Sequence, residues 1–309
     1  MTDSMADRDG FIWMNGTFVP WRDASVHILT HTLHYGMGVF EGIRCYQIKN
    51  GGAVFRLDDH IRRLFNSAKI FEIKIPYDVN KIKYAILELI EKNSLKSCYI
   101  RPLVFYGSEK MGLSTEGCSV NVSIAAWAWG TYLGDDGLNN GIKVKTSSFS
   151  RHHVNSALVR AKACGYYINS ILAHQEVARH GYDEALILDT DGYVSEGAGE
   201  NIFIVRNGTL LTTDLSTCLE GITRDTVISL ARELGFHLVE KRITRDEIYS
   251  AEEAFFTGTA AEITPIVSLD DRKIGAGRRG TITKKLQDLF FDIVNGNNKS
   301  HENWLTHVK

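Results

Sequence analysis

The chain has 309 residues, with 35 lysines and arginines against 37 aspartates and glutamates, so its formal net charge is −2. This balance argues against a nucleic-acid-binding protein, which would carry an excess of basic residues. Hydrophobic residues make up 44% of the chain, which is enough for sizeable cores and too much for a disordered protein. At about 150 residues per domain, the length predicts two domains.

The cysteines and the N-terminal segment indicate a soluble protein of a reducing compartment. The five cysteines are an odd number, are widely spaced and include no Cys-x-x-Cys pair, so neither a disulfide framework nor a zinc ribbon is expected. The first ten residues, MTDSMADRDG, are polar and acidic and do not resemble a secretory signal. No stretch approaches the roughly 18 apolar residues of a membrane span. We therefore expect a cytoplasmic protein without a membrane partner.

The N-terminal half begins with a hairpin pattern. Two apolar segments, 11–14 and 17–19, flank Asn15-Gly16, a pair that favours a type I′ turn. Apolar residues at helical spacing predict helices over 57–68 and 79–90. Further apolar runs predict two more strands, at 98–106 and 119–129.

The C-terminal half mixes strands and helices without regular alternation. The predicted elements are strands at 185–189, 201–205, 236–241 and 253–257 and helices at 166–179, 222–234 and 282–294. Thr244 and Glu247 form a capping-box pattern for a short helix. The irregular order favours two α+β domains over a doubly wound sheet.

A glycine-rich segment marks the predicted domain boundary. Residues 130–141 read GTYLGDDGLNNG, and glycine, aspartate and asparagine in this density interrupt both helices and strands. We therefore predict an N-terminal domain over 1–130, a linker over 131–141 and a C-terminal domain over 142–309. The polar stretch 295–304 is expected to pack loosely.

Two patterns point to ligands, and each has a plainer interpretation. Gly275, Gly277 and Gly280 have the spacing of a dinucleotide-binding loop, but neither a preceding strand nor an acid about 20 residues later accompanies them. Histidines occur at positions 27, 31, 34, 152 and 153 without the converging spacing of a metal site, which favours structural or surface roles. A metal-dependent hydrolase using these histidines is the alternative function of a different class.

Three further features carry possible chemistry. Glu196 and Glu200 stand in a glycine-rich turn, where they are either an acid–base pair, as in glycoside hydrolysis, or part of a polar turn. Gly221 precedes an amphipathic helix, where free backbone N–H groups either bind phosphate or are capped in the ordinary way. Lys162 lies between small residues, Ala161 and Ala163, and is either a nucleophile beside a planar ligand or a solvated side chain. A lysine, a carboxylate and a phosphate cradle are together what a pyridoxal-phosphate enzyme needs.

The motifs that contain these features resemble those of the class IV, fold-type IV aminotransferases, and within them the branched-chain amino acid aminotransferases. The family signature runs from Glu196 through Asn201-Ile202-Phe203 and Leu210-Leu211-Thr212 to Leu219-Glu220-Gly221-Ile222-Thr223-Arg224. Subfamily motifs are present at 34–36, 40–44, 99–102, 129–134 and 258–262. The resemblance extends from about Trp13 to Val294.

The resemblance implies an α+β fold with a smaller N-terminal α/β domain, a larger C-terminal domain and an active site at their junction. It implies transfer of the amino group of branched-chain L-amino acids (leucine, isoleucine, valine) to 2-oxoglutarate through pyridoxal 5'-phosphate, with ping-pong kinetics. It also implies a homodimer or homohexamer without a nucleic-acid or membrane partner. D-amino acid aminotransferases, (R)-amine aminotransferases and aminodeoxychorismate lyases are the alternatives within this fold, and a non-catalytic binding protein is an alternative outside it.

The resemblance also assigns residues to roles. Lys162 would be the catalytic lysine that carries the cofactor and moves a proton. Of the other cofactor-binding residues, Arg56, Ile222, Thr223 and Thr259 would hold the phosphate, Glu196 would meet the pyridine nitrogen and Tyr167 the ring hydroxyl oxygen. The substrate-binding residues would be Tyr35, Phe40, Tyr99, Arg101, Trp129, Tyr132, Thr259 and Ala260. The chain departs from the family pattern at Tyr166, where asparagine is common, and at Glu220, where proline is common.

Overall fold

The computed structural model describes residues 4–130 and 134–308 and divides the chain into two compact units. Unit 1 contains Met1–Trp129, Ala161–Tyr166 and Val294–Lys309, and unit 2 contains Gly130–Arg160 and Tyr167–Ile293. The first long segment of unit 1 ends at Trp129, and two later segments of the chain also belong to this unit. The domain bounds expected from the sequence stay a prediction.

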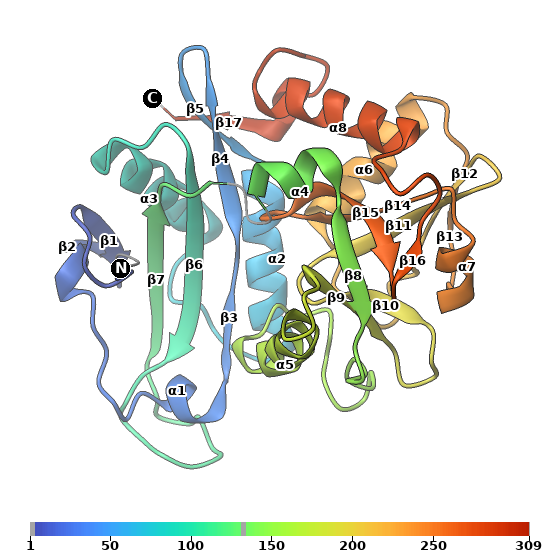
Figure 1. The fold of residues 1–309 in the computed structure, drawn as a ribbon. Helices are drawn as coiled ribbons and strands as arrows, with labels where there is room; N and C mark the ends of the chain where they lie inside the picture. Colours follow the sequence, from blue (N-terminus) through green and yellow to red (C-terminus); the bar gives the residue numbers. More distant parts are fainter. Residues whose placement is uncertain (1–3, 131–133, 309) are drawn as a thin grey trace. The chain divides into compact units, whose positions relative to one another are not determined.

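Unit 1 is built on an eight-stranded antiparallel sheet in the order β17-β5-β4-β6-β7-β1-β2, with β3 beside β6 (Figure 1). Its strands are β1 (Phe11–Met14), β2 (Thr17–Pro20), β3 (Gly38–Phe40), β4 (Ile43–Ile48), β5 (Gly51–Phe55), β6 (Cys98–Tyr106), β7 (Val120–Trp127) and β17 (Leu305–His307). Its helices are α1 (His31–Tyr35), α2 (Leu57–Ile70) and α3 (Val79–Lys92). The predicted hairpin is confirmed: Asn15 and Gly16 adopt φ values of 50° and 95°, as a type I′ turn requires.

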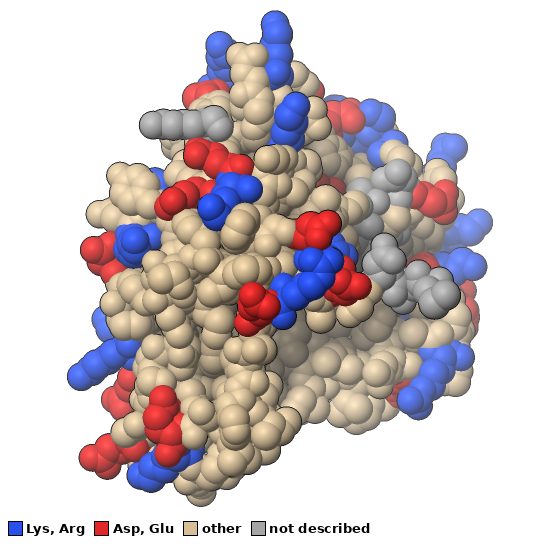
Figure 2. Space-filling model, turned by 90° about the vertical axis from the view of Figure 1, so that its left-hand side faces the viewer, with Lys and Arg blue, Asp and Glu red and all other residues tan. Residues whose placement is uncertain are grey.

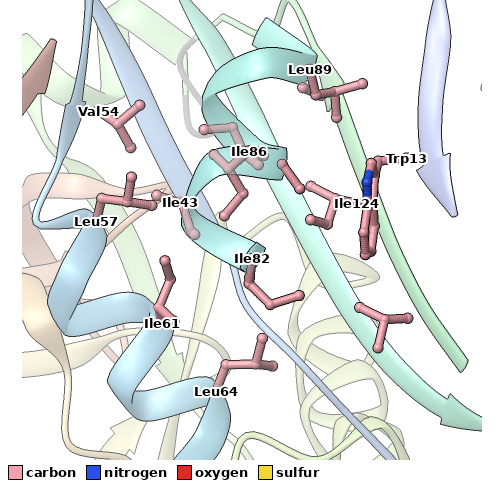
Figure 3. Close-up of a cluster of buried hydrophobic side chains, with 14 of the residues drawn as sticks. Trp13, Ile43, Val54, Leu57, Ile61, Leu64, Ile82, Ile86, Leu89 and Ile124 are labelled. Atoms are coloured by element: carbon pink, nitrogen blue, oxygen red, sulfur yellow. The ribbon is translucent and has the colours of Figure 1, made fainter. Parts of the chain in front are cut away.

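The core of unit 1 lies between this sheet and helices α2 and α3 (Figure 3). The apolar faces of both helices point inward, as their spacing predicts. The fully buried side chains include Leu57, Ile61 and Leu64 from α2, Ile82, Ile86 and Leu89 from α3, and Trp13, Ile43 and Ile124 from the sheet. Asp78 caps the start of α3 by accepting a hydrogen bond from the Lys81 N–H at 2.7 Å. This packing fixes α2 against the strands that carry the candidate site.

Unit 2 is built on a nine-stranded mixed sheet in the order β10-β9-β8-β15-β14-β11-β12-β13, with β16 beside β15. Its strands are β8 (Ile142–Thr146), β9 (Glu184–Leu188), β10 (Val194–Gly197), β11 (Asn201–Arg206), β12 (Thr209–Thr212), β13 (Leu238–Glu240), β14 (Glu253–Gly258), β15 (Glu262–Leu269) and β16 (Arg272–Lys273). Its helices are α4 (Gly134–Asn140), α5 (Tyr167–Ala178), α6 (Ile222–Glu233), α7 (Arg245–Tyr249) and α8 (Thr281–Val294). Strand β8 pairs in parallel with β9 and β15, whereas most other pairs are antiparallel, so the predicted α+β class is confirmed.

Two segments differ from the predictions. Residues 134–140 of the predicted linker form helix α4, which is held by a hydrogen bond from Gln287 Nε2 to the Leu138 carbonyl at 3.0 Å. The stretch 295–304 does not pack loosely throughout, because the Trp304 carbonyl accepts a hydrogen bond from the Arg56 N–H at 2.7 Å. The capping box at Thr244 and Glu247 is present as predicted and begins α7.

The surface shown in Figure 2 carries basic and acidic side chains interspersed over a largely uncharged area. On this face the charges do not form the broad basic patch that binding to a polyanion would need. Within residues 4–130 and 134–308, none of the helices has the combination of length and apolar character that crossing a membrane requires.

Candidate active site

In unit 1, the backbone of Lys162 is held between β3 and α2. The Lys162 carbonyl accepts a hydrogen bond from the Phe40 N–H at 3.1 Å, and the Lys162 N–H donates to Ser67 Oγ at 3.0 Å. Its ammonium nitrogen lies 5.0 Å from the centroid of the Phe40 ring. The flanking Ala161 and Ala163 are buried, so the lysine belongs to a packed segment and not to a solvated surface run.

Aromatic side chains gather beside this lysine. Tyr99 and Arg101 lie two residues apart on β6, and Arg101 Nη2 donates to the Tyr99 hydroxyl at 3.2 Å. The ring of Trp129 meets that of Tyr99 edge-on with centroids 4.6 Å apart. The Arg101 guanidinium also lies over the Phe40 ring at 4.7 Å. The structure thus brings together four of the predicted substrate-binding residues.

Arg101 keeps hydrogen-bonding capacity in this cluster. Its Nε atom is buried and has no hydrogen-bond partner among residues 4–130 and 134–308, and none of the acidic side chains described there forms an ion pair with it. The nearby Cys164 is held as a neutral thiol, because burial raises its pKa to about 11. A guanidinium beside aromatic rings and without an acidic partner is suited to a carboxylate ligand.

A further predicted substrate-binding residue, Tyr35, makes other contacts. Tyr35 is exposed; its ring packs on His31 with centroids 4.6 Å apart, and its hydroxyl accepts from the Gly112 N–H at 3.2 Å. Tyr132 lies outside the described residues. The substrate-binding role of each residue stays a prediction.

Arg56, predicted to bind phosphate, lies at the start of α2. It adopts a left-handed conformation with φ 50°, its guanidinium pairs with Asp59, and it lies 5.2 Å from the ring centroid of Trp304. These contacts hold the side chain at the N-terminal end of α2. The phosphate role of Arg56 stays a prediction.

The sequence analysis did not predict a buried cluster that Glu41 forms with two residues of the same helix, His60 and Arg63. Glu41 is fully buried and accepts hydrogen bonds from Arg63 Nε at 2.6 Å and Nη2 at 2.9 Å, and it contacts His60 Nδ1 at 2.7 Å. Although burial opposes ionisation, Arg63 and His60 hold the pKa of the Glu41 carboxyl well below its usual range. Burial lowers the pKa of His60 although the Glu41 carboxylate opposes this effect, and the charges of Arg63 and Lys162 lower it further. A neutral His60 therefore lies within electrostatic reach of Lys162.

The signal for this cluster is visible in the sequence in retrospect. Residues 56, 60, 63 and 67 are polar and share one face of α2, because they are three or four positions apart. Glu41 lies between Phe40 and Gly42 in a motif that was noted but assigned no role. Only the tertiary structure brings this carboxylate to that helix face.

In unit 2, Glu196 lies on β10 with its carboxylate largely buried. Its Oε1 is 3.1 Å from Arg151 Nε, and its Oε2 accepts from the Leu219 N–H at 3.2 Å. Asn201 Nδ2 donates to the carbonyl of the same residue, Leu219, at 2.9 Å. Two side chains of the family signature thus hold the segment that leads to α6.

That segment sets up the start of α6. Gly221 is the N-cap, no side chain caps this end, and a Cβ atom on Gly221 would overlap Asn201 Oδ1. The first N–H groups of a helix have no partner within it and carry its positive dipole end. The buried Ile222 and Thr223 supply such groups, so this end can bind an anion. Thr259 is half-buried in the turn between β14 and β15, as is its neighbour Ala260.

The two carboxyl groups of the glycine-rich turn have different environments. Glu196 pairs with the buried Arg151, which also donates to the Gly197 carbonyl at 2.8 Å. Glu200 is buried without such an ion pair among the described residues, and burial together with the negative charges of Glu184 and Glu196 raises its pKa well above the ordinary value. Glu196 is therefore the member suited to remain ionised.

The two departures from the family pattern are accommodated locally. Tyr166 packs edge-on against Phe71 with ring centroids 6.0 Å apart. The exposed Glu220 lies 3.7 Å from Arg160, so its charge is partly compensated. Tyr167, predicted to bind the cofactor, is the half-buried first residue of α5.

Two of the N-terminal histidines form hydrogen bonds with backbone carbonyls. His31 Nε2 lies 2.8 Å from the Gly112 carbonyl, and His34 Nε2 lies 2.8 Å from that of Ile28. Among the residues that the structure describes, no group of three or more histidine, cysteine or acidic side chains is placed to hold a metal ion.

Comparison with known proteins supplies the family. The sequence profile of the family "Amino-transferase class IV" matches residues 38–269. A branched-chain-amino-acid aminotransferase of Pseudomonas aeruginosa is 59% identical over 306 residues, which cover 99% of this chain and 100% of that protein.

Solved structures agree with this match. The crystal structure of the Escherichia coli branched-chain amino acid aminotransferase has a TM-score of 0.96 at 45% identity and covers 98% of this chain and 100% of its own. The branched-chain amino acid aminotransferase from Thermobaculum terrenum, solved in its PLP-bound holo form, has a TM-score of 0.92 at 37% identity and covers 97% and 99% of the two chains. This chain therefore belongs to the class IV aminotransferase family, among its branched-chain amino acid aminotransferases.

Proposed function

We propose that this protein transfers the amino group of branched-chain L-amino acids to 2-oxoglutarate with pyridoxal 5'-phosphate as its cofactor. The observation that carries the proposal is the cluster in unit 1 in which Lys162, three aromatic rings and one guanidinium without an acidic partner among the described residues lie together. The names of the relatives support the substrate class, and the holo form of one of them supports the cofactor.

The residues present fit the proposed cofactor. A phosphate group needs N–H donors without a competing cap, and the start of α6 offers them at Ile222 and Thr223. A pyridine nitrogen that is to stay protonated needs a buried anion, and Glu196 is held for this by Arg151. An aldehyde needs an amine, and Lys162 lies in a packed segment between small residues.

When bound, pyridoxal phosphate supplies a ring that withdraws electrons and stabilises negative charge at the substrate α-carbon. Lys162 Nζ is proposed to hold the cofactor and then to move the proton at that carbon. The charge of Arg151 and the Leu219 N–H keep the Glu196 carboxylate oriented and ionised. Burial lowers the pKa of His60, so this side chain adds no positive charge near Lys162.

The substrate pocket has to accept an aliphatic side chain in one half-reaction and a carboxylate in the other. Phe40, Tyr99 and Trp129 are proposed to surround the aliphatic side chain. Arg101, whose Nε has no partner among the described residues, is proposed to bind the carboxylate of glutamate and 2-oxoglutarate. Burying that carboxylate without a cation would be costly, so one pocket needs both kinds of residue.

A homodimer or homohexamer in the cytoplasm is part of the proposal. Several apolar side chains of the 26–35 segment and the following loops of unit 1 are exposed, including Ile28, Leu33 and Leu113, and apolar surface of this kind favours contact with another subunit. All five cysteines are free thiols, which suits a reducing compartment. Light scattering on the purified protein would give the subunit number.

The test of the proposed function is an assay of both products. Purified protein with pyridoxal phosphate is incubated with leucine and 2-oxoglutarate, and 4-methyl-2-oxopentanoate and glutamate are measured by chromatography. We expect the two products in equal amounts, and none when either substrate is omitted. Formation of the 2-oxo acid without glutamate would reject amino transfer, and turnover of D-leucine alone would reject the stereochemical assignment.

A further inference from the structure

Glu200 fills the space between two glycines that belong to different parts of the candidate site in unit 2. A Cβ atom on Gly197 would lie 2.7 Å from Glu200 Oε2, and a Cβ atom on Gly258 would lie 3.5 Å from Glu200 Cγ. Gly197 directly follows Glu196, and Gly258 directly precedes Thr259. Glu200 therefore packs against both the turn that carries Glu196 and the strand end that leads to the proposed phosphate-binding loop.

Hydrogen bonds fix Glu200 in this position. Its Oε2 accepts from the Gly199 N–H at 2.9 Å, and its backbone carbonyl accepts from the Gly197 N–H at 2.6 Å. The residue is 5% exposed, so the carboxyl group has little access to water. A carboxylate buried in this way would need a cation of its own.

The charges around Glu200 are predominantly negative. The negative charges of Glu184 on β9 and Glu196 on β10 raise the pKa of the Glu200 carboxyl, and the positive charge of Arg151 lowers it. The Arg151 side chain pairs with Glu196, and Glu184 Oε2 is buried without a hydrogen-bond partner among the described residues. Behind Glu184, His174 of α5 lies 3.3 Å from Glu184 Oε1. Arg151 pairs with Glu196 and His174 lies beside Glu184, so Glu200 is the buried carboxyl group without a cationic partner among the described residues and is the one suited to keep its proton.

We infer that Glu200 is a positioning residue which, in its protonated form, holds the Glu196 turn against Gly258 and leaves Glu196 as the ionised partner of Arg151. The inference rests on the proposed role of Glu196 in binding the cofactor ring. Loss of the proton from Glu200 would place a second negative charge beside Glu196 and Glu184 and push the turn away from β14. Cofactor affinity would then fall at high pH through a residue that does not touch the cofactor.

The sign of the pH effect follows from the environment. Burial and the charges of Glu184 and Glu196 raise the pKa of Glu200 in the folded protein above its value in the unfolded chain. The folded state therefore binds this proton more tightly, and the stability it contributes is present at low pH and is lost as the pH rises through the raised pKa. His174 adds a similar loss near neutral pH, because its hydrogen bond to Glu184 raises its pKa.

The test measures the unfolding temperature and the cofactor affinity between about pH 5 and pH 10 in a His174→Gln background, which removes the histidine contribution. In this background the unfolding temperature should fall by about 2–4 °C for each pH unit by which the pH rises, until the pH reaches the raised pKa of Glu200. Glu200→Gln, a neutral side chain of the same shape, should remove most of this fall and keep tight cofactor binding at high pH. Glu184→Gln should shift the fall to lower pH, because it removes a charge that raises the pKa of Glu200.

Two further variants separate positioning from simple packing. Glu200→Ala should weaken cofactor binding by about tenfold at every pH, since the Gly199 N–H loses its acceptor. Exposed Glu233→Gln, on the last turn of α6, should leave both pH curves unchanged. Curves for Glu200→Gln that match those of its parent would overturn the inference even if the enzyme is a transaminase. If the pH curves of the variants are as expected but the purified protein shows no transaminase activity, the result supports the protonated packing of Glu200 and counts against the proposed function.

Discussion

The hydroxyl oxygen of Tyr99 occupies the space beside the backbone of Gly42 where a side chain would otherwise begin. A Cβ atom on Gly42 would overlap Tyr99 Oη, and Tyr99 Cζ would lie 2.8 Å from it. Gly42 directly precedes β4, which pairs with the strand of Tyr99, β6. The glycine is therefore required by the position of the tyrosine ring and not by a turn.

Gly42→Ala should displace Tyr99 and weaken substrate binding. We expect KM for leucine to rise on the order of tenfold to a hundredfold, because a displacement of about 1 Å at a binding site has effects of this size. Steady-state kinetics with leucine at saturating 2-oxoglutarate would measure it. Gly130→Ala is the matched control, since a Cβ atom there meets no atom within 4 Å among the residues that the structure describes. Unchanged KM in Gly42→Ala would mean that Tyr99 does not bind substrate.

Glu196→Gln should reduce turnover by orders of magnitude with the fold retained. The amide has nearly the same shape but no negative charge, so it cannot keep a neighbouring ring nitrogen protonated. Single-turnover absorbance changes after mixing with leucine would give the rate. Glu200→Gln in the same turn should have a mild effect near neutral pH. Equal and mild effects at both positions would favour the polar-turn interpretation of these carboxylates.

Arg101→Ala should affect the two half-reactions unequally. The half-reaction with glutamate or 2-oxoglutarate should slow much more than the one with valine or leucine, because only the former places a second carboxylate in the pocket. Rapid-mixing absorbance measurements on each substrate alone separate the two. If both half-reactions lose the same factor, Arg101 supports Tyr99 and Phe40 structurally, and another group binds the second carboxylate.

Arg56→Ala should weaken cofactor binding more than it slows the saturated enzyme. A charged hydrogen bond to phosphate contributes about 1.5–3 kcal/mol, which corresponds to one to two decades in affinity. Cofactor retained after dialysis, measured by absorbance, is the readout. Full retention in Arg56→Ala would refute its phosphate role.

Arg63→Ala makes the contrast with Arg56 informative. Removal of the Arg63 guanidinium leaves His60 as the remaining titratable partner of the buried Glu41 carboxylate. This loss should lower the free energy of unfolding by several kcal/mol and so lower the unfolding temperature. Loss of cofactor in Arg63→Ala at temperatures where the protein stays folded, with full retention in Arg56→Ala, would move the phosphate role to the Glu41 cluster.

The limits of the sequence predictions have physical causes. The strand over 98–106 was predicted with its observed bounds because its apolar pattern is local. Strand β17 was not, because Leu305–His307 becomes a strand only by pairing with β5, some 250 residues earlier in the chain. Helix α4 was not predicted, because glycine, aspartate and asparagine have a low helix propensity. Its contacts with β15 and Gln287 outweigh this low propensity.

The candidate site divides in the same way. The resemblance assigned a cofactor role to Glu196 within the family signature, and the structure shows that the side chains of Glu196 and Asn201 both form hydrogen bonds with the backbone of Leu219. The buried contact of Glu41 with His60 and Arg63 was not predictable, because it joins a strand end to one helix face through tertiary packing. The raised pKa of Glu200 depends on burial and on the charges of Glu184 and Glu196, which only the folded chain brings together.

The most direct test of the account is to locate the cofactor on the chain. The purified protein with pyridoxal phosphate is treated with borohydride, digested and analysed by mass spectrometry, with Lys162→Ala and the exposed-residue control Lys143→Ala treated in parallel. We predict one phosphopyridoxyl group, on Lys162, in the wild type and in Lys143→Ala, and neither label nor turnover in Lys162→Ala. A label on another lysine, or near-normal turnover in Lys162→Ala without added amine, would contradict the account.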